Sequence, residues 1–112
     1  MGKTTIETKP LVEALSSTAT LFRMGAMRIL VLNDYTLNEN IVLAEGDRPV
    51  TAINSPLWAN TSSGIYFKGG NTNLNEAGII KAYATTSYNA ATAQIVLDDT
   101  EKIKSTLIWS VV

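Results

Sequence analysis

Residues 21–32 read LFRMGAMRILVL, two apolar runs on either side of a glycine. The second run, residues 27–32, is apolar at nearly every position, which is typical of a central strand covered on both faces. Gly25 predicts a turn or bulge between the runs, because glycine reaches backbone conformations that other residues avoid. The stretch therefore predicts two strands, the second of them inside a sheet.

Outward from this stretch, short apolar or alternating segments recur between turn residues. They cover residues 41–43, 50–53, 57–59, 64–68, 77–83, 92–97 and 105–112. Residues 11–15 are expected to be extended, residues 54–56 to end a strand, and residues 69–73 to form a flexible tip. No window longer than two helical turns has a convincing helical period. About eight short strands, spaced roughly 8–12 residues apart, predict an all-β fold, an antiparallel β-sandwich or barrel.

Composition narrows the possible functions. The 112 residues are enough for one domain and contain neither cysteine nor histidine, which removes disulfides, thiolate nucleophiles, the usual zinc ligands and the usual general base. A net charge of −1 gives no basic field for nucleic acid, and the longest apolar run is far too short to insert into a membrane. We expect no enzyme activity, no metal and no cofactor.

Uncharged polar residues point to a binding surface. Thr, Ser and Asn account for 31 residues, and these side chains suit strands, turns and wet surfaces. Trp58 and Tyr66 lie near turns rich in such residues, an arrangement that favours carbohydrate binding, because sugar faces stack on rings while hydroxyls bond to short polar side chains. For any single aromatic residue, an ordinary position at the rim of a sandwich is the simpler interpretation. Trp109, in an alternating terminal strand, is expected to pack in a core or an interface.

The order of several short elements resembles a known family. Arg23-x-Gly25 leads into the apolar strand 27–32, and Leu43, Gly46 and Arg48-Pro49 follow. Later elements are Gly64, the Gly-led strand 77–80 and the terminal strand 107–111 with its tryptophan. Over residues 20–112 the chain resembles the C-terminal head domain of receptor-binding proteins, the tail-fibre or baseplate tips of phages of Gram-positive bacteria. The family often has Leu-Pro before the Gly-x-Arg-Pro turn, whereas here Leu43 is followed by Ala44-Glu45, and the family's Tyr before Arg-Pro is Asp47 here.

The resemblance implies a non-enzymatic, homotrimeric head that binds host cell-wall saccharide reversibly within a phage virion, attached to other tail or baseplate proteins. It implies a head over residues 20–112, with residues 1–19 a linker or the remnant of a neck or shaft. Candidate saccharide contacts, chosen by residue chemistry in or beside predicted loops, are Asp34, Tyr35, Trp58, Asn60, Tyr66, Asn71, Asn73 and Tyr88.

Two other functions remain open. The chain could be a structural virion, baseplate or decoration protein without a ligand, since low charge and high β content fit that role equally well. It could also be a small glycosidase using two carboxylates from among Asp34, Asp98, Asp99 and Glu101. The pair Asp98-Asp99 more readily predicts a solvated turn, because adjacent strand residues point to opposite faces.

Overall fold

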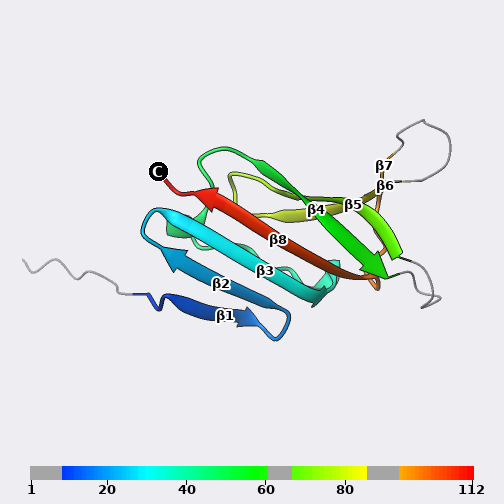
Figure 1. The fold of residues 1–112 in the computed structure, drawn as a ribbon, viewed down its shortest axis with the longest axis horizontal. Coiled ribbons are helices and arrows are strands. Elements are labelled where there is room, and N and C mark those ends of the chain that lie inside the picture. Colours follow the sequence, from blue (N-terminus) through cyan, green and yellow to red (C-terminus); the bar gives the residue numbers. More distant parts are fainter. Residues whose placement is uncertain (1–8, 61–66, 86–93) are drawn as a thin grey trace, which may run out of the picture.

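The computed structural model describes residues 9–60, 67–85 and 94–112, and its main feature is one antiparallel sheet of eight strands (Figure 1). The predicted all-β class with about eight strands is confirmed. The strands are β1 (Val12–Ser16), β2 (Ala19–Met24), β3 (Met27–Tyr35), β4 (Ile53–Asn60), β5 (Phe67–Leu74), β6 (Ile80–Thr85), β7 (Gln94–Val96) and β8 (Lys102–Ser110). Two short 3-10 helices, η1 (Leu37–Glu39) and η2 (Glu45–Asp47), lie between β3 and β4.

The strand order places the last strand in the middle of the sheet. The order is β1-β2-β3-β8-β4-β5-β6-β7, so β8 joins a first half, β1–β3, to a second half, β4–β7. In Figure 1 the red arrow of β8 lies beside the cyan arrow of β3. All neighbouring pairs are antiparallel.

Of the turn or bulge predicted at Gly25, the structure shows the turn, which joins β2 and β3 into a hairpin. Strands β2 and β3 pair in continuous register from Ala19↔Leu32 to Met24↔Met27. Gly25 has a φ of 61°, in the left-handed region that glycine adopts without a steric penalty. The turn therefore lies where the glycine was expected to place it.

One face of the sheet, the inner face, carries the core. Its buried residues come from both halves and form one cluster. Leu21 and Leu30 belong to the first half, Leu107 to β8, and Leu57 and Leu74 to the second half. The connection 36–52 covers this face with Leu43, Leu37 and Ile41. Trp109 is also buried in the cluster, which confirms its predicted packing role.

The sequence interpretation of β4 was wrong at both ends. Residues 50–52 are outside any strand, and β4 runs through residues 54–56, which were expected to end one. Pro56 is tolerated because the pairing of β4 with β8 starts only at Leu57, so its missing N–H breaks no bond of that ladder. Ser105 Oγ donates to the Pro56 carbonyl at 2.8 Å, and Thr72 Oγ1 donates to Ser105 Oγ at 2.9 Å. Side-chain hydrogen bonds thus connect β4 to β8 at the residue before the ladder begins.

Three other predictions differ from the structure. Residues 69–73, expected to be a flexible tip, lie inside β5. Residues 41–43, expected to be a strand, make only the isolated bridge Val42↔Ile79. Residues 12–16, placed in the N-terminal linker, form the edge strand β1 and pair with β2, which confirms over residues 12–15 the extended structure expected for residues 11–15.

Candidate functional site

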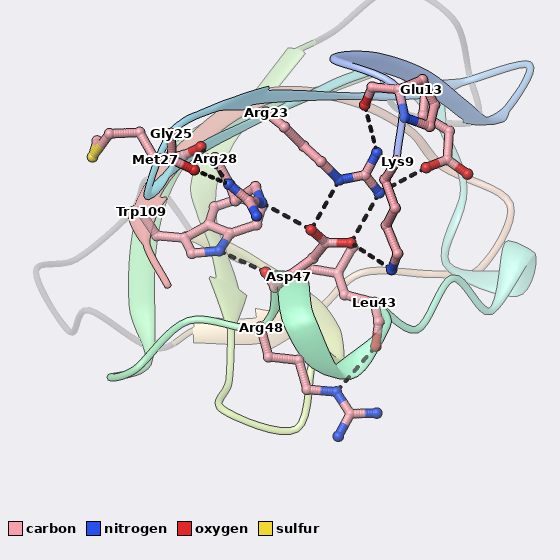
Figure 2. A network of polar contacts seen from close by, with 11 residues as sticks. Lys9, Glu13, Arg23, Gly25, Met27, Arg28, Leu43, Asp47, Arg48 and Trp109 are labelled. Carbon is pink, nitrogen blue, oxygen red and sulfur yellow. Dashed lines mark hydrogen bonds and ion pairs between the residues drawn. The ribbon is translucent and has the colours of Figure 1, made fainter. Parts of the chain in front are cut away.

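The most conspicuous polar feature is a buried network around Asp47 (Figure 2). The Arg23 guanidinium donates to both carboxylate oxygens, from Nε at 3.0 Å and Nη2 at 2.9 Å. Arg28 Nε donates at 2.8 Å, and Lys9 Nζ lies 3.6 Å away. The Asp47 carbonyl accepts from Trp109 Nε1 at 2.8 Å. This network joins η2 to β2, β3 and β8.

The Asp47 network holds the fold together and leaves little for a ligand to bind. Hydrogen bonds from Arg23 outweigh burial and, with those from Arg28, lower the pKa of Asp47 to about 2. The same pairing raises the pKa of Arg23, which also donates to Glu13 and to the Pro10 carbonyl. A cavity of about 560 Å³ adjoins the network, but the charged groups of Arg23 and Asp47 facing it are already paired with each other.

The opposite face of the sheet, the outward face, is turned to solvent, and its two halves differ in polarity. Its first half carries an apolar row in direct register across four strands, Val12↔Phe22↔Ile29↔Ile108. Val12 and Ile108 are each more than half exposed, and Phe22 and Ile29 are half-buried. In the second half, β4, β5 and β6 are polar apart from Pro56 and Trp58, and β7 adds the exposed Val96 opposite Tyr83.

Trp58 is a large aromatic side chain of this polar half, and it is 61% exposed. It lies opposite Gly69 on β5 and Lys104 on β8. A Cβ added to Gly69 would be 3.6 Å from Trp58 Cζ3, so the indole ring extends over the glycine. Trp58, Lys104 and Pro56 also line a hollow of about 450 Å³. The ring is thus an open apolar platform beside a strand surface without a side chain.

Next to this platform is a second hollow of about 490 Å³, the amide hollow, lined by Asn54, Asn71, Asn73 and Tyr83. The register places Asn71 opposite Pro56 and Tyr83, and Asn73 opposite Asn54. Asn73 Nδ2 donates to Asn54 Oδ1 at 3.1 Å, which orients both amides. In the described part of the chain, no hydrogen bond engages the side chain of Asn71. The hollow therefore presents amide donors and acceptors beside an exposed indole.

The structure brings together three of the eight residues that sequence chemistry selected. Trp58, Asn71 and Asn73 share the outward face of β4 and β5. Asp34 is exposed in the bulge of β3, on the far side of β8 from β4, with a φ of 55°. Asn60 ends β4, but its side chain lies outside the described residues, as do Tyr66 and Tyr88.

Tyr35 is corrected as a candidate contact. It was selected as part of a loop predicted over residues 33–40, but β3 extends through it and turns its ring inward, where it is 2% exposed. Burial raises the pKa of its hydroxyl, which also has a hydrogen bond with the backbone of Ile41. The ring is part of the core and is not available to a ligand on the surface.

Sequence reasoning missed Asn54 and Tyr83. Extending β4 through Pro56 would have revealed the first, because Asn54, Pro56 and Trp58 alternate with period two and share a face. The second belongs to β6, where the same alternation places Lys81 and Tyr83 outward. The alternation of outward and inward residues was present in the sequence. It was not recognised because Pro56 and the glycine pair at 69–70 were interpreted as the ends of strands.

No family model, curated protein or solved structure matches the chain. Within residues 9–60, 67–85 and 94–112, no helix is long and apolar enough to cross a bilayer. The same residues contain no cluster of three or more carboxylates arranged to hold a metal ion.

Proposed function

We propose that this chain is a non-catalytic saccharide-binding domain, of the kind that forms the receptor-binding heads of phage tails, and that it binds host cell-wall glycan through its outward face. One observation carries the proposal: the exposed Trp58 ring lies beside a hollow lined by three asparagines and a tyrosine. The order of sequence elements that resembles the phage head family supports the same class of function.

The chemistry of the face suits a sugar. A pyranose ring has an apolar face of C–H groups, which packs on indole, and a rim of hydroxyls, which need both donors and acceptors. Amides supply both from one side chain, and the Tyr83 hydroxyl does the same. Because these groups stand on paired strands, little conformational entropy is lost when a ligand orders them.

A shallow face of this kind gives weak individual contacts. Reversible attachment then depends on several copies binding one polymer, and a homotrimer carried on a tail with other baseplate proteins would supply them. Linked sites raise the effective affinity by about 10²–10⁴ without new contacts. The bound polymer is expected to be released with its length unchanged.

The test is binding of the full chain to an array of Gram-positive cell-wall polysaccharides, followed by calorimetric titration of those retained. Trp58→Ala is expected to weaken binding by about tenfold or more, equivalent to about 1.4 kcal/mol. Val50→Ala is the matched control, because Val50 is 60% exposed but lies off the outward face. A chain that binds no polysaccharide, or for which both variants bind as the parent does, overturns the proposal.

A second candidate, a structural subunit of a virion, is favoured by the apolar row. Val12, Phe22, Ile29 and Ile108 form a continuous strip that burial against another subunit would stabilise. Both roles can occupy one molecule, because the row and the amide hollow lie on different halves of the outward face. The glycan titration distinguishes a purely structural subunit from one that also binds saccharide.

A further inference from the structure

The described charged residues at the paired outward-facing positions are all lysines. Three exposed lysines project from this face: Lys81 on β6, and Lys102 and Lys104 on β8. None of the described outward-facing positions that has a cross-strand partner is an aspartate or glutamate, and Asp34 is exposed beside them in the bulge of β3. The chain as a whole has a net charge of −1, so its acidic groups are concentrated elsewhere.

The acidic groups that are described lie on the inner face, in connections or at the sheet margins. Asp47 and Glu101 are buried, and Glu39 accepts hydrogen bonds from Thr18, Ser16 and the Thr36 amide. The exposed acid nearest in the chain to an outward-facing position is Asp34, in the bulge that follows Asn33 on β3. Asp98 and Asp99 are exposed in the connection after β7, where Leu97 N donates to the Ala82 carbonyl beside Lys81. Lysines are therefore the charged residues of the paired outward-facing positions, and carboxylates lie at the margins.

Two of the lysines border the proposed saccharide site. Lys104 is the cross-strand neighbour of Trp58, and both side chains line the same hollow. Lys81 is the cross-strand neighbour of Asn73, at the other end of the amide hollow. Such neighbours have Cβ atoms about 5 Å apart, so each ammonium group can reach a ligand held by its partner. Within the described residues, no ion pair joins Lys81, Lys102 or Lys104 to a carboxylate.

We infer that the ligand of this face is an anionic glycan, whose carboxylate or phosphodiester groups pair with Lys81 and Lys104 while a sugar ring stacks on Trp58. The inference rests on the proposed function and specifies its substrate class. Lys102 lies opposite Asn60 at the end of β4. Its positive charge is placed to attract the next anionic group of a polymer that continues past the Trp58 ring.

The experiment titrates the polysaccharides retained by the array at about 0.05 M and 0.5 M salt, which shortens the reach of electrostatic attraction severalfold. The retained polymers are expected to be anionic and to bind about tenfold more weakly at the higher salt concentration. Uronic-acid polymers and poly(glycerol phosphate), both present on the array, distinguish carboxylate from phosphodiester recognition. Lys81→Gln and Lys104→Gln are each expected to weaken binding about two- to fivefold, as loss of one exposed ion pair does.

A charge-balanced variant separates local contacts from net charge. Lys104→Gln removes one positive charge, and adding Glu45→Gln removes one negative charge, which restores the net charge of −1. Glu45 is chosen because it is exposed in η2, away from the outward face. This double variant is expected to bind as weakly as Lys104→Gln alone. Full recovery in the double variant would show that only overall charge matters, and would overturn the inference.

The remaining outcomes are equally distinct. A neutral polysaccharide that needs Trp58 and ignores both salt and the lysine variants leaves the proposed function standing and overturns this inference. Anionic binding that survives Trp58→Ala is general electrostatic adhesion and also overturns it. No binding to any polymer overturns the proposed function together with the inference.

Discussion

At the scale of single residues, Asp47 has the largest structural consequence. It is one side chain on a one-turn helix, yet Arg23, Arg28 and Lys9 all pair with its carboxylate. The sequence resemblance drew attention to Arg23, but treated Asp47 only as a departure from the family pattern. The structure shows that this departure supplies the carboxylate to which the arginine binds.

Asp47→Asn is expected to destabilise the domain by about 3 kcal/mol at pH 7, because Arg28 loses its carboxylate partner and Arg23 keeps only Glu13. The pKa of Asp47 is lowered from 3.8 to about 2, so its pairing contributes fully above about pH 4 and is lost as the pH falls through 2. A shift of that size is worth about 2 kcal/mol. Urea unfolding at pH 7 and at several points down to pH 2 measures both effects.

The variant should show a shallower loss of stability with acid than the parent. A residual acid dependence is expected from Glu39, whose pKa is also lowered, because hydrogen bonds from Thr18, Thr36 and Ser16 outweigh its burial. Glu45→Gln, on the exposed side of the same short helix, is the control and should unfold as the parent does. Parent-like stability of Asp47→Asn at pH 7 would contradict the assigned role.

At the scale of elements, the hairpin β2–β3 could be predicted from sequence and the pair β4–β5 could not. In the hairpin, the break between the two apolar runs and the position of Gly25 both indicate where β2 ends and β3 begins. In β4–β5, Pro56 and the glycines at 69 and 70 suggest breaks, but the partner strands overrule them. Pro56 lies where the ladder to β8 has not begun, and Gly70 allows β6 to approach closely. Asn71 and Asn73 could be selected as saccharide candidates from their side-chain chemistry. That they share a face with Trp58 follows from the pairing of β4 with β5, which the local sequence does not predict.

The two glycines of β5 should respond differently to a methyl group. In Gly70→Ala the new Cβ would come within 2.9 Å of the Tyr83 carbonyl carbon and 3.0 Å of Ala84 Cα, which forces β5 and β6 apart. We expect a loss of about 3 kcal/mol in the free energy of unfolding. Gly69→Ala places its Cβ at ordinary contact distance from Trp58 and should change stability by about 0.5 kcal/mol or less. Thermal or urea unfolding compares them, and equal stabilities would refute the close approach of β6.

At the scale of the whole molecule, one sheet has two unlike faces. The inner face is a conventional core under the connection 36–52, while the outward face divides into an apolar half and a lysine-bearing polar half. A domain of this size buries a limited fraction of its surface on its own, so association of identical copies through the apolar row would add to its stability.

The proposed homotrimer would have a molar mass near three times 12.1 kDa by light scattering. Ile108→Glu places a charge in the middle of the apolar row and should shift the mass towards that of a single chain. Val50→Glu introduces the same charge at a comparably exposed site off the row and should leave the mass unchanged. A parent chain that is monomeric at high concentration, or an Ile108→Glu variant that remains trimeric, would be incompatible with assembly through this row.

The central position of β8 has a consequence for synthesis on the ribosome. Residues 102–110 pair with both β3 and β4, so the two halves of the sheet cannot join until this segment has left the exit tunnel. Until then, the β2–β3 hairpin has an unpaired edge and two apolar faces, a species prone to aggregate. The rate at which residues 102–110 are translated, or a chaperone that shields the nascent hairpin, would thus influence the yield of native protein.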